Sequence, residues 1–475
     1  MTVSSREREP ISERSQDLTE KIFPKEGELS GSLSPISWAL TNYSVLRNTM
    51  IPLDGSIPTV LLIWFQAIAD AIPTRARTTV MELVFGCMLT GRGHVTQAIA
   101  AITPRRGWRA YFRMIETDGF SWLDIVHALC RIVRDSFVPQ DCCVMALDDT
   151  LLLRSSKKAP GAARRFDHAG KPNRPRHVLA QNLVSLSTVI GPPGRRRSLP
   201  LASRLFDDGL DGGKLTTAKI LIGAVLHQLR PDILLVDAWF MRARLVLWAV
   251  ARGITVVGQA RLDTALFLRP RPRRGRGRPA KYGMRFDRDK LALLPVVEKR
   301  LGVYHNVPIR FRSFRFRARF LGGLEVRAVW ISLRVKGRWT RNRLLLSTDP
   351  TMTPEAIIRL YADRWTIEPM FNSLKHAEGA KELWQRSKEA FHRWLHLVQA
   401  GMALTVMLSL RDDPDIVRLA HAGPWRREVH PTPGMIKDGL IRRFWNCRVD
   451  GLFARKGRKS RRIPVAGPPP MASAA

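Results

Sequence analysis

The segment YADRWTIEPMFNSLK, residues 361–375, carries the pattern that best indicates the fold and its chemistry. Tyr361 is followed by Arg364, Glu368 and Lys375 at offsets of 3, 7 and 14 residues. At about 100° per residue these four side chains fall within a sector of about 60° on one face of a helix. An acid flanked along one stripe by Tyr, Arg and Lys suits a site that binds a cation and phosphates together. The alternative is an amphipathic surface helix with an ordinary i, i+4 charge pair.

Acids also follow two short apolar runs earlier in the chain. Residues 142–147 (CCVMAL) precede Asp148 and Asp149, and residues 232–236 (DILLV) precede Asp237. We expect both runs to be strands that end at these acids, on the sheet edge where ligands bind. Together with Glu368, such acids would form an oxygen-rich site for two Mg²⁺ ions. A single strand-end Asp is otherwise often a cap or turn residue.

The segments around these acids alternate between two periods. Residues 178–190 and 255–258 have strand patterns, and residues 217–229 and 242–251 have helix patterns. Strands that alternate with helices predict an α/β core. Residues 307–320, 324–335 and 344–346 alternate in strand fashion with many Arg on one face, which predicts a β-rich insertion.

These patterns divide the chain into six regions. We expect a tail at 1–35, a helical DNA-binding region at 36–135, and an α/β core at 136–260. The insertion follows at 261–353, the final helices of the core at 354–412, and a basic C-terminal region at 413–475. From about Arg426 we expect this region to be a loosely ordered tail that contacts DNA or is simply solvated. The helical region could instead merely pack on the core.

The charge balance indicates a nucleic-acid partner. Lys and Arg number 78 against 41 Asp and Glu, a formal net charge of +37, and the basic residues are spread along the whole chain. Residues 276–279 (RGRP) resemble the minor-groove AT-hook core, although a flexible basic loop would look the same. Five scattered cysteines without a C-x-x-C pair, and no bilayer-spanning run, predict a cytoplasmic protein with reduced thiols and no membrane contact.

The pattern Y-(2)-R-(3)-E-(6)-K over residues 361–375 is the signature of bacterial DDE transposases of the insertion-sequence four family, which this chain therefore resembles. The segments around Asp149 and Asp237 are similar to the two Asp segments of that family. The order of two Asp, a β-rich insertion and a Glu is also that of the family. The resemblance covers roughly residues 80 to 400.

The resemblance implies a fold and an activity. The fold is α/β, with an RNase H-like catalytic core interrupted by the β-rich insertion and preceded by the helical region. The activity is endonuclease cleavage at the ends of a mobile element and strand transfer into target DNA, which is cut-and-paste DNA transposition and recombination. Double-stranded DNA, a homodimer on paired element ends, and a nucleoid-associated bacterial location follow from the same resemblance.

The resemblance also assigns residues. Asp149, Asp237 and Glu368 would hold two Mg²⁺ ions, with Mn²⁺ as a substitute. Neighbours on a strand point to opposite faces, so either Asp149, which we prefer, or Asp148 is the first acid. Contacts to phosphates near the cut end would come from three side chains of the signature helix: Tyr361, Arg364 and Lys375. Three tryptophans could stack on a flipped base, although a core role fits each of them as well: Trp330, Trp339 and Trp365.

Two other functions fit parts of the pattern. The basic charge alone would suit a decayed or domesticated transposase that binds DNA without catalysis. A stand-alone RNase H-like nuclease would cut DNA without joining it. The presence of every acid argues against the first, and the insertion before Glu368 favours a transposase over the second.

Overall fold

The computed structural model describes residues 57–138, 142–167, 170, 173, 175–206, 209, 213–271, 279–423, 429–449 and 451–453. The expected N-terminal tail, the AT-hook residues 276–278 and the basic run from residue 454 onward lie outside these ranges. The chain forms two compact units, residues 1–55 with 164–178, and residues 56–163 with 179–475. In the first unit, Asp167 N–H donates to the Arg176 carbonyl (2.7 Å), and the Phe166 ring meets His177 edge-on.

The N-terminal helical region of the second unit is present, as its periodicity predicts. Its helices are α3 (Thr59–Ala71), α4 (Thr74–Leu89), α5 (Val95–Ala100), α6 (Trp108–Glu116) and α7 (Trp122–Ser136). Pro73, which has no N–H to continue α3, stands at the N-cap of α4. Nearly all of α4 is buried, so this region shares a hydrophobic core with the rest of the unit.

The central sheet has the strand order of an RNase H-like fold. Its strands are β1 (Val144–Leu153), β3 (His177–Ile190), β4 (Arg197–Leu205), β5 (Ile233–Val236) and β6 (Thr255–Ala260). They lie in the order β4-β3-β1-β5-β6, with the first three antiparallel and β1, β5 and β6 parallel. Helices α8 (Gly213–Val225) and α9 (Ala243–Val250) are the connections from β4 to β5 and from β5 to β6. The expected α/β core is therefore confirmed, and β4 and the short β2 (Ala162–Phe166) are strands that were not predicted from the sequence.

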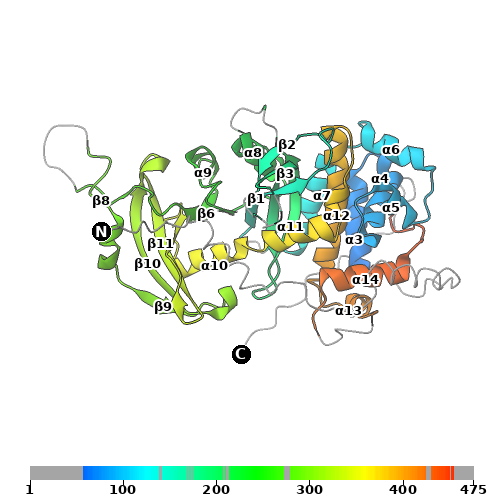
Figure 1. Cartoon of the computed structure of the whole chain (residues 1–475). Helices are drawn as coiled ribbons and strands as arrows, with labels where there is room; N and C mark the ends of the chain where they lie inside the picture. The colour runs from blue at the N-terminus through cyan, green and yellow to red at the C-terminus, as the bar shows by residue number, and fades with distance from the viewer. Residues whose placement is uncertain are drawn as a thin grey trace, which may run out of the picture. The chain divides into compact units, whose positions relative to one another are not determined.

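The insertion is β-rich, as expected, but it continues the central sheet. Its strands are β7 (Leu266–Phe267), β8 (Arg285–Phe286), β9 (Val297–Lys299), β10 (Ile309–Ala318), β11 (Leu324–Val335), β12 (Arg338–Trp339) and β13 (Arg343–Ser347). Strand β13 pairs antiparallel with β6, and β11 and β10 follow it in order. Figure 1 shows these strands beside β6, with α10 reaching from them toward β1.

Five α-helices complete the part of this unit that the structure describes. They are α10 (Pro354–Arg364), α11 (Ile367–His376), α12 (Lys388–Leu408), α13 (Pro414–Ala420) and α14 (Pro433–Phe444). Helix α12 is buried almost throughout and packs against both β4 and α4 (Figure 1). None of the helices in the described ranges combines the length and the apolar character that a bilayer span requires.

The C-terminal part corrects the expected loosely ordered region. Helix α14 buries Ile436, Leu440 and Phe444, which contribute to the common core. Lys437 of the same helix donates to the Glu378 carboxylate at 2.5 Å, and both side chains are buried. These three apolar residues are four positions apart, which is helical spacing, whereas the prediction followed the basic composition of the segment.

Candidate active site

The first two acids lie inside a strand, not at its end. Strand β1 runs through Asp148 and Asp149 to Leu153, because its antiparallel pairing with β3 continues past them. Only the parallel pairing with β5 stops before them, at Leu147 opposite Val236. The prediction that the strand ends at Asp148 and Asp149 was therefore wrong, but both acids still lie where the neighbouring parallel strand β5 ends.

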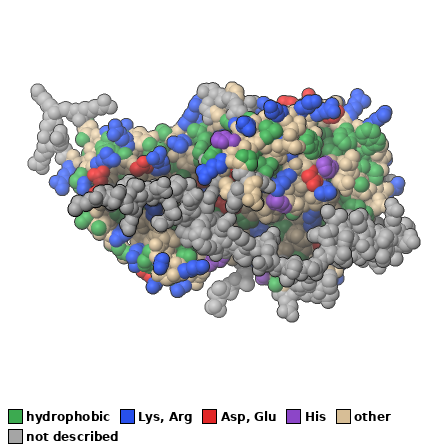
Figure 2. Space-filling view, in the orientation of Figure 1, with side chains coloured by type: hydrophobic (Ala, Val, Ile, Leu, Met, Phe, Trp, Pro, Cys, Tyr) green, Lys and Arg blue, Asp and Glu red, His purple; other side chains and the backbone are tan. Residues whose placement is uncertain are grey.

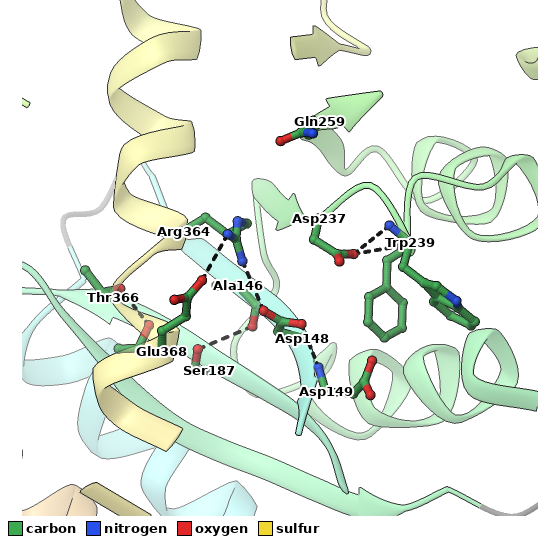
Figure 3. A network of polar contacts seen from close by, with 12 residues as sticks. Ala146, Asp148, Asp149, Ser187, Asp237, Trp239, Gln259, Arg364, Thr366 and Glu368 are labelled. Carbon is green, nitrogen blue, oxygen red and sulfur yellow. Dashed lines mark hydrogen bonds and ion pairs between the residues drawn. The ribbon is translucent and has the colours of Figure 1, made fainter. Parts of the chain in front are cut away.

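Asp148 and Asp149 point to opposite sides of the strand and have different partners. Asp148 accepts a hydrogen bond from Arg364 at 3.0 Å. Asp149 accepts from Lys214 Nζ at 2.7 Å and from Asn182 Nδ2 at 2.8 Å. Figure 3 shows the Asp148 carboxylate facing Arg364, and the Asp149 carboxylate on the side away from Glu368.

Asp237 directly follows β5, as expected. Its Oδ1 accepts backbone N–H groups from Trp239 and Phe240, both at 2.9 Å, and these bonds fix the carboxylate in the turn. The Phe240 side chain is fully buried, so the turn is anchored in the core. Asp237 thereby presents its carboxylate beside that of Asp148 (Figure 3).

Glu368 lies in the first turn of α11, just after a break in the signature helix. Pro369 has no N–H to donate to the Trp365 carbonyl, and its ring crowds that carbonyl, so α10 ends at Arg364 and α11 begins at Ile367. The Thr366 hydroxyl lies 2.7 Å from the Ser198 hydroxyl of β4 and ties the break to the sheet. Arg364 Nη2 donates to Glu368 at 3.4 Å while Nη1 binds Asp148.

We call Asp148, Asp237 and Glu368 the acid cluster, and its electrostatics reflect crowded carboxylates. Burial, followed by the nearby charge of Asp237, raises the pKa of Asp148 to about 7, and Arg364 opposes this rise. Burial also raises the pKa of Asp237 and of Glu368. Arg364 is 5% exposed and is the cation that touches two of the three acids. Such perturbed acids, gathered where a parallel strand ends, are typical of a functional site.

Comparisons with known proteins fit this geometry. Residues 68–209, which include Asp148 and Asp149, match the family model described as "DDE superfamily endonuclease". Residues 211–404, which include Asp237 and Glu368, match the model described as "Transposase DDE domain". These two matches support a DDE-superfamily transposase. The two models meet between β4 and α8 and together span the core and the insertion.

The other comparisons add little. No significant match to this transposase was found among curated proteins. The solved structure of the NurA nuclease from Sulfolobus solfataricus is similar over 49% of this chain and 75% of that one, at 12% identity and a TM-score of 0.23. A TM-score this low carries no argument about function.

The break in the signature helix changes the positions of the other signature residues in this transposase. Tyr361 is buried, and its hydroxyl donates to Gln259 of β6 at 3.0 Å. The Arg364 guanidinium lies between the rings of Tyr361 and Trp365, at 5.5 and 5.2 Å from their centroids. Lys375 is half-buried in the last turn of α11. The predicted single stripe is therefore divided between two helices joined by a short turn, and Arg364 contacts both Tyr361 and Glu368.

Carboxylate oxygens are the ligands that Mg²⁺ prefers, so the side chains of the acid cluster have the right chemistry for this metal. Within the described residues, no three His, Cys, Asp or Glu side chains lie close enough to hold one metal ion together. Arg364 stands between Asp148 and Glu368, while the charge of Asp237 raises the pKa of Asp148 and the charge of Asp149 raises the pKa of Asp237. A cation at Asp237 would therefore relieve repulsion with both neighbouring aspartates.

The structure favours the alternative reading of Arg364, and it adds one site residue. Arg364 was expected to face DNA, but it is buried against the acids and forms the i, i+4 pair with Glu368 that the sequence analysis gave as the alternative. Trp239 was not considered as a site residue, although it follows Asp237 by two positions. Trp239 is 40% exposed, while Trp330 is 7% exposed and the Trp339 ring is covered by Arg310 at 4.1 Å.

Proposed function

We propose that this chain is an active cut-and-paste transposase of the insertion-sequence four type, which cleaves the ends of its element and joins them to target DNA. The observation that carries the proposal is the meeting of Asp148, Asp237 and Glu368, from β1, the end of β5 and the start of α11, around one buried arginine. An acid from each of three separate elements is the composition that two-metal phosphodiester chemistry needs.

The first acid of the active site is Asp148 in this proposal, in place of the initially preferred Asp149. Asp148 shares Arg364 with Glu368 and lies beside Asp237. Asp149 is neutralised by Lys214 and held by Asn182 on the other side of the strand. Asp148 is paired with a cation too, so the choice of Asp148 rests on its place beside Asp237 and on the arginine that it shares with Glu368.

The acid cluster would hold two Mg²⁺ ions, or Mn²⁺ in their place. These ions would supply activation of a water or 3′-OH nucleophile and stabilisation of the leaving oxygen. The chain's own contribution is to orient the acids. The Trp239 and Phe240 amides fix Asp237, and Arg364 holds Asp148 and Glu368 toward each other.

DNA contacts follow from charge and position. Lys375, in the last turn of the helix that carries Glu368, is the signature residue that we assign to a phosphate near the cut end. Arg364 and Tyr361 are assigned a positioning role, because their polar atoms bind Asp148, Glu368 and Gln259. Lys and Arg side chains are scattered over the face in Figure 2, in keeping with a broad DNA-binding surface. A homodimer on paired element ends would bring two such sites together.

An excision assay in cells tests the proposal. A marker bracketed by the gene's own flanking DNA is placed on a plasmid, and the protein is supplied separately. Asp148→Asn, Asp237→Ala and Glu368→Gln are each expected to lower excision by about 100-fold or more, since each removes a metal-binding carboxylate. Asp149→Asn is the matched control and is expected to stay within about tenfold of the wild type.

Each other outcome has a defined meaning. Excision by Glu368→Gln at the wild-type rate would rule out the catalytic role of the acid cluster. A dead Asp149→Asn variant beside an active Asp148→Asn variant would return the first acid to Asp149. No excision by any version, with binding to the flanking DNA intact, would identify a decayed transposase that binds DNA without catalysis. Excised DNA that is never joined would identify a nuclease without strand transfer.

A further inference from the structure

Gln259 is the residue of β6 that lies level with two acids of the acid cluster. The parallel strands β1, β5 and β6 are in register, and the first residue beyond their last paired level is polar in all three strands: Asp148, Asp237 and Gln259. Neighbouring strands lie about 5 Å apart, and side chains at one level of a parallel sheet point to the same face. Gln259 therefore extends the row of the two aspartates by one strand, beyond Asp237 (Figure 3).

One helix contacts both ends of this row. On α10, Arg364 Nη1 donates to Asp148 at 3.0 Å, and the Tyr361 hydroxyl donates to Gln259 Oε1 at 3.0 Å. Tyr361 and Arg364 are three residues apart, so their side chains are neighbours on one helix face. Gln259 therefore faces the same side of the sheet as Asp148, and its carboxamide belongs to the same site as the acids.

The bond from Tyr361 leaves the nitrogen of the carboxamide available. While Oε1 accepts from Tyr361, the Gln259 Nε2 carries two N–H donors, and none of the described residues accepts from them. Gln259 is half-buried, and its Nε2 is not one of the buried polar atoms, so a ligand can reach it. Tyr361 is only 2% exposed. The buried tyrosine thus fixes a carboxamide whose donors point to an accessible part of the site.

A neutral donor beside carboxylates suits one kind of partner, the phosphodiester of a DNA strand. Phosphate oxygens accept hydrogen bonds from side-chain amides as well as from cations. A lysine at this level would form an ion pair with Asp237 and compete with metal ions, whereas an amide adds no charge. Successive nucleotides of a strand are about 3.4 Å apart along the duplex axis. A strand that follows the row therefore passes Gln259 about one or two nucleotides from the phosphate at the acid cluster.

We propose that Gln259 Nε2 donates to a non-bridging oxygen of a phosphodiester about one or two nucleotides from the scissile one, and that Tyr361 orients the carboxamide for this contact. This inference rests on the proposed function, since it takes the acid cluster as the place of cleavage. Gln259 contacts the substrate, whereas Tyr361 is a positioning residue that acts through Gln259.

A phosphate-by-phosphate binding assay tests this contact. The full chain carries Glu368→Gln, so that the DNA is not cut, and the probe is a duplex of the element's own end with its flanking DNA. In each probe one methylphosphonate replaces a single phosphate, which removes the negative charge of that phosphate. The measured quantity is the change in affinity that each methylphosphonate causes, first with Gln259 in place and then in each variant at this position.

Gln259→Glu is the most informative variant, because it keeps an acceptor for Tyr361 and removes both donors. We expect it to weaken binding of the unmodified duplex by about 10-fold or more. At the contacted phosphate, the methylphosphonate is expected to weaken binding by about 10-fold when Gln259 is present. The same methylphosphonate is expected to strengthen binding to Gln259→Glu, since it removes the repulsion between two negative charges. Gln259→Met is expected to be insensitive at this one phosphate.

Controls separate this contact from general effects. Gln66→Glu on α3 changes another half-buried glutamine and is expected to show no reversal at that phosphate. Tyr361→Phe is expected to reduce the effect of the same methylphosphonate by about 3-fold, because the carboxamide can then rotate. Tyr304→Phe is the matched control, since the Tyr304 hydroxyl has no hydrogen-bond partner among the described residues. An equal reduction in both tyrosine variants would remove the positioning role of Tyr361.

The inference would be overturned by a Gln259→Glu variant, folded as judged by its melting temperature, that responds to every methylphosphonate as Gln259 does. A reversal more than about two nucleotides from the mapped excision site would overturn it too, since Gln259 would then act apart from the place of cleavage. The readout does not depend on cleavage. A protein that never excises its element but shows the reversal would refute the proposed function and leave the phosphate contact in place.

Discussion

Arg364→Gln is the substitution for which the structure gives the clearest stability prediction. The guanidinium is 5% exposed and binds Asp148 at 3.0 Å and Glu368 at 3.4 Å. Removing one partner of a buried ion pair costs about 3–5 kcal/mol, because the remaining charge stays buried and unpaired. The Glu368 side chain is 45% exposed, so the loss of its ion pair costs little stability. We expect the loss of the Asp148 ion pair to lower the free energy of unfolding by about 3 kcal/mol.

The pH dependence of this loss follows from Asp148. Its pKa in the folded protein is raised to about 7, so the folded state binds this proton more tightly than the unfolded state does. The corresponding stability is present at low pH and is lost as the pH rises from the unfolded value of about 4 through 7. At pH 5 the carboxyl is mostly neutral and needs Arg364 little, whereas at pH 8 it is ionised. Arg364→Gln is therefore expected to destabilise more at pH 8 than at pH 5.

The assay is thermal unfolding of the full chain in EDTA at both pH values. We expect the melting temperature of Arg364→Gln to fall by roughly 5 °C or more at pH 8. Arg261→Gln is the control, because Arg261 and Asp263 form an exposed pair and no measurable shift is expected. The reasoning fails if the two variants shift equally at pH 8, or if the Arg364→Gln shift is the same at both pH values.

Three further outcomes follow from buried contacts. Glu378→Gln is expected to lower the free energy of unfolding by about 3–5 kcal/mol, because it leaves Lys437 buried without its partner. The double variant Glu378→Leu, Lys437→Met is expected to recover most of this free energy, since no charge is then buried. Denaturant titrations measure both changes. Gly379→Ala is expected to give little soluble protein, since φ is +68° and the added Cβ would lie 2.1 Å from the Gly93 nitrogen; wild-type yield and melting temperature would contradict this. Burial lowers the pKa of His396 to about 4, so the stability it contributes is present above about 6.5 and is lost as the pH falls toward 4. His396→Gln should make the melting temperature fall less between pH 7 and 5, while His392, whose pKa burial lowers to about 3, keeps part of the fall.

The periodic segments were predictable because their patterns are local. Strand alternation in β3, β10 and β11 indicated those strands nearly to their ends, and helical spacing in residues 60–133 indicated several helices without their individual bounds. The Y-R-E-K spacing indicated the superfamily, and the position of Asp237 after an apolar run indicated a sheet-edge acid. These inferences needed only the side-chain periods of helices and strands.

Which residues face one another was decided by the tertiary structure. Strand β1 extends through Asp148 and Asp149 because β3 supplies hydrogen-bonding partners from a distant part of the chain, and that pairing sets which acid faces Arg364. Pro369 can be read from the sequence, but where the missing N–H of this proline ends a helix is decided by the fold. As a result, Tyr361 and Arg364 lie on α10, and Lys375 lies on α11. The contact of Lys214 with Asp149 and Trp239 joins three segments through the fold alone. A sequence carries the period of each segment, whereas the side from which a neighbour approaches depends on how all segments pack.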